Sequence, residues 1–182
     1  PARCNSLTLG KALNYALENG ARIINLSLAG PADRLLQALL QAALARGVIV
    51  VAAADPRLPD GGFPAALPGV IGVARPGDHH PAPSTLVYAP GTDIPTCAPG
   101  QRWHMVSGSS YAAAHVAGLA ALLAERQPGT VAQTLRRQAD GAMTARTGGN
   151  IDACAALSRA ADTCVCLCTS TVATAPSSLR LR

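Results

Sequence analysis

The chain has 182 residues, of which 49% are hydrophobic, 14% are charged and only 3% are aromatic. A chain of this length and apolar content can bury a core, which excludes disorder along its whole length and fits one domain or a large part of one. The arginines behind the net charge of +5 are scattered and every apolar run is interrupted, so we expect neither a nucleic-acid partner nor a membrane span.

Helices and buried strands alternate in the first part of the chain. Apolar residues at helical spacing predict one helix after Ser6, ended by Gly20, and a second helix over residues 32–46. The expected inner face of the second helix holds five residues: Leu35, Leu36, Leu39, Leu40 and Ala43. Short apolar runs at 22–28 and 48–53 are typical of buried parallel strands. This alternation predicts an α/β protein.

The middle of the chain predicts further short strands joined by polar loops. A buried strand is expected at 70–74, after a loop rich in Pro, Asp and Gly. Residues 75–83 are polar and turn-prone, so we expect His79 and His80 to be solvated on a surface loop. Two short strands separated by a Pro-Gly turn are expected within residues 85–97.

The last part of the chain predicts helices followed by a tail. Small apolar residues predict a helix over residues 111–125, and Thr130 can cap a further helix that reaches about residue 138. A last helix is expected over 151–161. We therefore divide the chain into a folded part, residues 1–161, and a cysteine-containing tail, residues 162–182, that we expect to be poorly ordered.

Six cysteines mildly favour an oxidising compartment. Six cysteines allow 15 full pairings, and the sequence does not choose among them. Cys164, Cys166 and Cys168 could hold a soft metal ion, but they lack the two-residue gaps of a zinc knuckle and have no neighbouring histidine. Free or paired thiols are therefore favoured over a metal site.

A candidate nucleophile lies directly before the helix over 111–125. Gly108-Ser109-Ser110 stands at the helix start, where unpaired N–H groups and positive potential can stabilise an oxyanion. Ser109 and Ser110 would serve equally well as an N-cap, and a serine in this place is more often a cap. The residues alone leave catalysis and capping both open.

The residues around these serines carry a resemblance. Ser107 to Gly118 reads Ser-Gly-Ser-Ser-Tyr-Ala-Ala-Ala-His-Val-Ala-Gly and resembles the nucleophile motif Ser-Gly-Thr-Ser-Met-Ala-x-Pro-His-Val-Ala-Gly of the subtilisin-like serine proteases, the subtilases. The match gives Ser110 the nucleophile's place, with Ser109 for Thr, Tyr111 for Met and Ala114 for Pro. It implies a three-layer α/β fold with a mostly parallel central sheet, and peptide-bond hydrolysis through an acyl-enzyme on Ser110.

A second block resembles the part of the family that binds the substrate main chain. Residues 23–30 are similar to the family strand that ends in Ser-Leu-Gly-Gly and pairs with the substrate. Ser27, Leu28 and Ala29 are then the candidate peptide-binding edge. A peptide that binds as an added strand gains main-chain hydrogen bonds and needs little side-chain identity. The alternative is an ordinary sheet edge.

A third block resembles the family's pocket for the side chain before the scissile bond, the S1 pocket for the P1 residue. Gly62 falls at its base beside Ala53, where a glycine leaves space for a large apolar P1 side chain; the alternative role of Gly62 is a turn. The resemblance also implies a cis bond at Phe63-Pro64. Ala-Pro-Gly at 89–91 and 98–100 repeats the family's two turns before the nucleophile.

The oxyanion region departs from the family pattern. Residues 47–54 resemble the strand that leads to a Gly-Asn pair, and here Asp55-Pro56 takes that place. Pro56 has neither an amide side chain nor a backbone N–H to donate. A register shift would bring Asp55 there instead, where an ionised carboxylate would repel the developing negative charge.

The family order places the catalytic aspartate and histidine before the strand at Ile23, so we expect both to lie before Pro1. None of the chain's four histidines follows the family pattern for the base, and we assign surface or packing roles to His79, His80, His104 and His115. This chain alone is therefore expected to be a very poor protease. Its expected partners are a polypeptide substrate and the missing N-terminal part of the same protease.

Two alternatives to the peptidase stay open. One is a pseudoprotease or peptide-binding module that keeps the cleft, which Asp55-Pro56 favours, and the other is an unrelated α/β protein with a capped helix at Ser109.

The resemblance implies a secreted or periplasmic protein, although the chain contains no signal peptide. Calcium sites are common in relatives, but no acidic cluster marks one, so no metal ligands and no cofactor are predicted. We expect exposed sheet edges and association if this piece is expressed alone.

Overall fold

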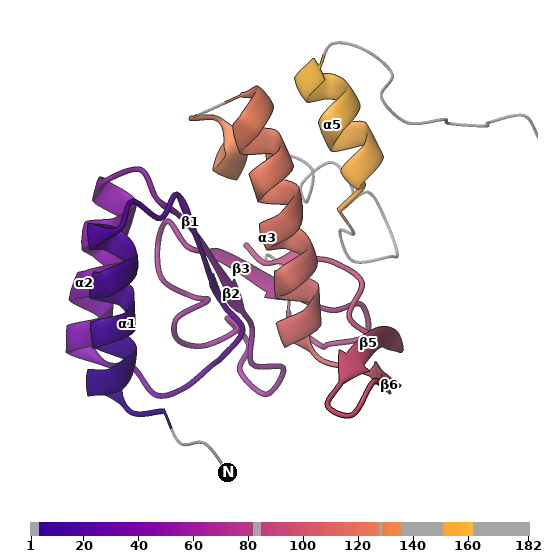
Figure 1. Cartoon of the computed structure of the whole chain (residues 1–182), viewed down its shortest axis with the longest axis horizontal. Helices are drawn as coiled ribbons and strands as arrows, with labels where there is room; N and C mark the ends of the chain where they lie inside the picture. The colour runs from indigo at the N-terminus through magenta and orange to yellow at the C-terminus, as the bar shows by residue number, and fades with distance from the viewer. Residues whose placement is uncertain (1–3, 82–84, 128, 136–150, 162–182) are drawn as a thin grey trace, which may run out of the picture.

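A parallel sheet forms the middle layer of the computed structural model, which describes residues 4–81, 85–127, 129–135 and 151–161. Its four strands lie in the order β1 (Ile23–Leu26), β2 (Ile49–Ala53), β3 (Ile71–Ala74) and β4 (Val87–Tyr88). Helices α1 (Ser6–Glu18) and α2 (Arg34–Ala45) cover one face, and α3 (Ser109–Arg126) covers the other (Figure 1). The predicted three-layer α/β architecture is confirmed.

The core lies on both faces of the sheet because side chains alternate along each strand. Val51, Ala53 and Val73 belong to the buried cluster on the α3 side. Val50 and Ala52, one residue out of step, belong to the cluster beneath α1 and α2. Burial on both faces explains why β2 is a continuous apolar run. Among the described residues, no helix is both long and apolar enough to cross a membrane.

Side-chain caps set where the first two helices begin. Asn5, not Ser6, caps α1: its Oδ1 accepts the N–H of Thr8 at 2.9 Å, and Thr8 Oγ1 accepts the N–H of Asn5 at 3.1 Å. Asp33 caps α2 by accepting the N–H of Leu36 at 2.9 Å. The second helix therefore starts at Arg34, two residues later than the periodicity predicts.

The predicted inner face of α2 is only partly correct. The buried residues of α2 are Leu36, Leu40 and Ala43. Leu35 is half exposed and Leu39 is partly buried, and both side chains lie over Gly10 of α1. Leu35 therefore packs sideways against the neighbouring helix, which is a contact that helical periodicity does not encode.

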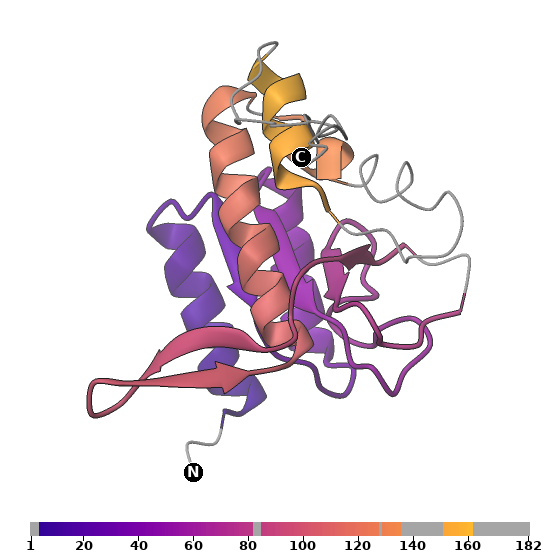
Figure 2. The ribbon, with the colours of Figure 1, turned by 90° about the vertical axis from the view of Figure 1, so that its right-hand side faces the viewer.

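An antiparallel ribbon projects beside the start of α3 (Figure 2). It consists of β5 (Ile94–Ala98) and β6 (Arg102–Val106), joined by a turn in which Gly100 and Gln101 have φ values of 83° and 57°. The sequence predicts the first strand but not the second. Trp103 and Met105 are both exposed, so β6 lacks the alternation of buried and solvated residues that identifies a strand.

The last described helix, α5 (Ala153–Ala161), packs against α3, as Ala156 joins the core on that side (Figure 1). Residues 131–135 are helical, and the N–H of Thr134 bonds to the carbonyl of Thr130 at 2.8 Å. The predicted extension to residue 138 and the tail over 162–182, including Cys164, Cys166 and Cys168, lie outside the described residues. Cys154 is disulfide-bonded, whereas Cys4 and Cys97 carry free thiols.

The two neighbouring histidines differ in their surroundings. His79 is exposed, as expected. Both ring nitrogens of His80 are buried and have no hydrogen-bond partner among the described residues, and its ring packs edge-on against Tyr88 with 6.4 Å between the ring centroids. The prediction that both side chains are solvated is therefore wrong for His80, because its loop folds back onto the strand that follows.

A close main-chain approach at Gly91 holds the loop that leads into α3. The N–H of Gly108 donates to the carbonyl oxygen of Gly91 at 2.8 Å. A Cβ at position 91 would lie 2.8 Å from the Gly108 oxygen and 2.9 Å from Cβ of Arg75. Only glycine therefore fits between these two segments without displacing the start of the helix.

We predict that Gly91→Ala lowers the free energy of unfolding by roughly 1–3 kcal/mol, because the added methyl group meets main-chain atoms that cannot turn aside. Gly118→Ala in α3 is the matched control, since nothing lies within 4 Å of the place that a Cβ would take there. Alanine favours the helix at this position by about 0.5–1 kcal/mol. Denaturant unfolding measures both changes, and equal stability of the two variants would contradict the steric argument.

Candidate functional site

Neither serine at the start of α3 caps the helix. Gly108 holds the N-cap position, and the described residues form no side-chain cap hydrogen bond there. Ser109 Oγ instead donates to the carbonyl oxygen of Ala54 at 2.6 Å, and Ser110 Oγ donates to that of Ser27 at 3.2 Å. The capping alternative is therefore wrong for both residues, and the main-chain N–H of Ser110 stays available at the positive end of the helix.

Reciprocal hydrogen bonds join Ser110 to the end of β1. Ser27 Oγ donates to the main-chain oxygen of Ser110 at 2.9 Å, while the Ser110 hydroxyl donates to the main-chain oxygen of Ser27. Asn25 Nδ2 donates to Ser27 Oγ at 3.0 Å and so orients that hydroxyl. Because Ser109 also bonds to the residue that follows β2, the first turn of α3 is tied to the carboxyl ends of two parallel strands.

The candidate peptide edge lies beside the predicted pocket. Ser27, Leu28 and Ala29 leave the sheet after β1. The next residue, Gly30, donates its N–H to the carbonyl oxygen of Phe63 at 3.0 Å, which brings the loop around Gly62 alongside the edge. The Phe63-Pro64 bond is cis, as the sequence predicts. Ala53, the last residue of β2, is buried.

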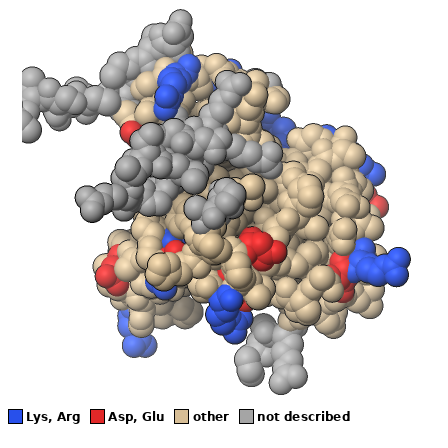
Figure 3. Space-filling model, turned by 180° about the vertical axis from the view of Figure 1, so that it is seen from behind, with Lys and Arg blue, Asp and Glu red and all other residues tan. Residues whose placement is uncertain are grey.

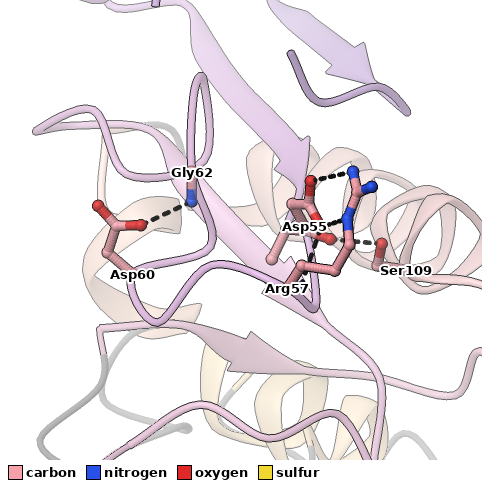
Figure 4. Close-up of polar contacts among 6 residues, drawn as sticks. Asp55, Arg57, Asp60, Gly62 and Ser109 are labelled. Carbon is pink, nitrogen blue, oxygen red and sulfur yellow. Dashed lines mark hydrogen bonds and ion pairs between the residues drawn. The ribbon is translucent and has the colours of Figure 1, made fainter. Parts of the chain in front are cut away.

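The space beside Gly62 is not empty. Its N–H bonds to Asp60 Oδ1 at 2.9 Å (Figure 4), and its φ of 67° favours glycine. A Cβ added at Gly62 would lie 2.5 Å from Cδ1 of Leu58. The glycine thus makes a turn and also leaves room for the side chain of Leu58, a residue that the sequence did not single out.

A bidentate ion pair occupies the loop predicted to be the oxyanion region. Arg57 Nε donates to Asp55 Oδ1 at 2.9 Å, and Arg57 Nη2 donates to Asp55 Oδ2 at 2.7 Å (Figure 4). The side chain of Asp55 is 13% exposed and that of Arg57 is 85% exposed. Hydrogen bonds from the Arg57 side chain and N–H lower the pKa of Asp55 to about 2. The same pair raises the pKa of Arg57, so both groups stay charged at neutral pH.

The loop places Pro56 at the surface between these two residues. Proline contributes no N–H there, which agrees with the departure seen in the sequence. The carboxylate of Asp55, however, is neutralised by its own neighbour. An isolated Asp55 carboxylate would repel a developing oxyanion. The ion pair with Arg57 weakens that repulsion.

No general base contacts Ser110 among the described residues. The hydroxyl donates to a carbonyl oxygen, which can orient it but cannot take its proton. His115 Nδ1 lies 2.8 Å from the carbonyl oxygen of Pro90, so this histidine fastens α3 to the Ala-Pro-Gly turn. The described residues also hold no group of three His, Cys, Asp or Glu side chains that could bind a metal ion.

Comparison with known proteins identifies the family of this chain. A model of the subtilase family matches residues 2–153. The chain belongs to the subtilase family. Solved structures agree: the prenylagaramide maturation protease PagA is 26% identical with a TM-score of 0.69, covering 90% of this chain and 70% of that one. The self-cleaved protease domain of PatA is 30% identical with a TM-score of 0.69, covering 89% of this chain and 70% of that one.

The curated relatives are longer than this subtilase chain. Subtilisin amylosacchariticus from Bacillus subtilis subsp. amylosacchariticus is 33% identical over 129 residues, which are 64% of this chain and 34% of that protein. Subtilisin DY from Bacillus licheniformis is 32% identical over 139 residues, which are 69% of this chain and 51% of that protein. The chain thus spans about a third of the first relative and half of the second.

We predict that Arg57→Gln returns the pKa of Asp55 from about 2 toward the ordinary value of 3.8. The reason is that the two hydrogen bonds from the guanidinium, which stabilise the ionised carboxylate, are lost. A carbon-detected NMR titration of the Asp55 carboxyl measures this change. Since the folded-state pKa is depressed, the stability contributed by the pair is present above the unfolded pKa, near 4, and is lost as the pH falls toward 2.

An unchanged Asp55 titration in the Arg57→Gln protein would show that the ion pair is not formed in solution. Arg34→Gln is the matched control, because Arg34 is an exposed arginine on α2 and is expected to leave the Asp55 titration as it is.

Proposed function

We propose that this subtilase chain carries the nucleophile, Ser110, and part of the peptide-binding cleft of a serine endopeptidase. The observation that supports this most is that the Ser110 hydroxyl is free of capping and bonds to Ser27 O, at the candidate peptide edge. A peptide carbonyl bound there would meet the hydroxyl and the Ser110 N–H together. Nucleophile and oxyanion donor at one helix start are the arrangement that acyl transfer needs.

In the proposed reaction the substrate binds as an added strand along Ser27, Leu28 and Ala29. Ser110 Oγ attacks the scissile carbonyl carbon, and a histidine outside the described residues takes its proton. The carbonyl oxygen becomes negatively charged and accepts a hydrogen bond from the N–H of Ser110. The histidine then returns the proton to the leaving amine, and water hydrolyses the acyl-enzyme.

The partner that supplies histidine and aspartate is, on this proposal, the remaining part of the same protease. β1 is the outer strand of the described sheet on its side, so a further strand can pair with it and lie next to Ser110. The proposed substrate is a polypeptide. We propose that the protein is secreted or periplasmic and uses no cofactor. On the face in Figure 3, basic side chains lie singly among acidic ones, which does not favour nucleic acid.

A peptide-binding module without catalysis is the second candidate. Pro56 at the oxyanion position favours it, as does a Ser110 hydroxyl whose acceptor is a carbonyl oxygen. Such a module would hold peptides along the same edge and release them intact. A test for peptide hydrolysis by the complete protein distinguishes the endopeptidase from the peptide-binding module.

We predict that Ser110→Ala abolishes labelling of the complete protease by a fluorophosphonate, because the bond to phosphorus forms at the nucleophilic oxygen. Ser107→Ala is the matched control: its hydroxyl lies in the same turn and accepts the N–H of Asp93 at 3.0 Å. Mass spectrometry of the labelled peptide identifies the modified serine. Labelling that persists in Ser110→Ala would disprove the assignment, and an unlabelled wild type would favour the binding module.

We predict that Leu58→Ala favours large apolar P1 side chains, because Leu58 fills the space beside Gly62 that the pocket needs. The ratio of kcat/KM for Phe over Ala at P1 should rise by about tenfold or more. Leu122→Ala, an exposed leucine on α3, should leave the ratio unchanged. An unchanged ratio in Leu58→Ala would place the P1 pocket elsewhere.

A further inference from the structure

We propose that the guanidinium of Arg57 is the second oxyanion donor of this site and replaces the asparagine that the subtilase pattern has at position 56. The inference rests on the proposed function, since it assigns a catalytic role within the same reaction. Asp55 is the positioning residue, because it holds the guanidinium by two hydrogen bonds.

The main chain holds the loop of Arg57 beside the start of α3. Asp55 follows the end of β2 by two residues, and its N–H bonds to the Gly61 oxygen at 2.8 Å, which closes the loop. Ala54, the residue before it, accepts the hydroxyl of Ser109 at 2.6 Å. The loop that carries Arg57 is therefore anchored to the residue next to the nucleophile. Figure 4 shows the guanidinium on the side of Asp55 that faces Ser109.

The guanidinium has donors to spare. Arginine carries five N–H donors, and Asp55 uses two of them, on Nε and Nη2, so three remain for a substrate oxygen. The side chain is 85% exposed, so the guanidinium is open to solvent. Asp55 also accepts the main-chain N–H of Arg57 at 3.0 Å, which fixes the turn at Pro56 and the starting direction of the side chain.

The charges suit a developing oxyanion. Proline at position 56 removes both donors that an asparagine would bring, while the next residue supplies a permanent cation. The carboxylate of Asp55 compensates that cation in the resting site, so no buried charge stands alone. When the oxyanion forms, it can accept hydrogen bonds from the N–H groups of the Arg57 guanidinium that Asp55 does not use.

Atoms and electrons balance in the proposed step. The Ser110 Oγ–C bond forms, the C=O π pair moves onto the substrate oxygen, and the Oγ proton passes to the histidine of the complete protease. The oxyanion accepts hydrogen bonds from the N–H of Ser110 and from Arg57. On collapse the pair re-forms the C=O bond, the C–N bond breaks, and the amine takes the proton from histidine.

The test compares transition-state and ground-state binding in the complete protease. Arg57→Gln should lower kcat by about 10²-fold with little change in KM, since loss of one oxyanion donor costs about 10²–10³ in subtilisin. A peptide aldehyde, whose hemiacetal oxygen mimics the oxyanion, should bind more weakly by a similar factor. In the Ser110→Ala background, Arg57→Gln should leave the Kd of an intact substrate peptide unchanged. In the protease that keeps Ser110, Arg57→Lys should retain more of kcat than Arg57→Gln does.

Arg34→Gln is the control for loss of one exposed arginine, and a single cooperative thermal unfolding transition in each variant excludes misfolding. If the wild type hydrolyses the peptide and Arg57→Gln keeps its kcat and aldehyde affinity, Arg57 is not the donor and the proposed function stands. If KM and the peptide Kd change while kcat does not, Arg57 binds substrate only, and the inference is wrong. If the wild type forms no acyl-enzyme, the proposed function fails and the inference fails with it.

Discussion

The site depends on three hydrogen bonds that fasten the first turn of α3 to the ends of two strands. Two of them join Ser27 and Ser110, and the third joins Ser109 to the oxygen of Ala54. A helix that begins without a side-chain cap would ordinarily fray. Here the serines that could have capped it reach across to the sheet, and the close approach at Gly91 holds the preceding loop. The same bonds that hold the helix also aim the candidate nucleophile.

Rigidity on this side of the molecule comes from small residues. Ala112, Ala113 and Ala120 of α3 are fully buried, so the helix lies close to the sheet and its start cannot shift without disturbing the core. The loop that carries Asp55 and Arg57 is held mainly by polar contacts near the surface. The candidate nucleophile therefore lies on a packed helix, whereas the proposed oxyanion donor lies on a loop held by an ion pair.

Patterns of burial predicted most of the fold from sequence, because β2 and α3 are apolar where they are covered. They failed for β6, whose first four residues are exposed, and for Leu35, which packs sideways onto α1. In the site, the motif around Ser110 was visible, and so was the departure at Pro56. Arg57 was missed because its importance lies in a contact with Asp55 that only the turn creates. The spacing of the charged residues in the sequence does not predict this ion pair.

The exposed ribbon of β5 and β6 has a consequence for spectroscopy. Trp103 is the chain's single tryptophan, and it is 72% exposed on β6, where it pairs with Cys97 next to the turn of the ribbon. Its indole is already in water in the native state, so unfolding changes its surroundings little and its emission is a poor reporter of the core. A polypeptide that covers the ribbon would instead shield the indole. Intrinsic fluorescence of this chain thus follows whatever covers the ribbon more closely than it follows folding.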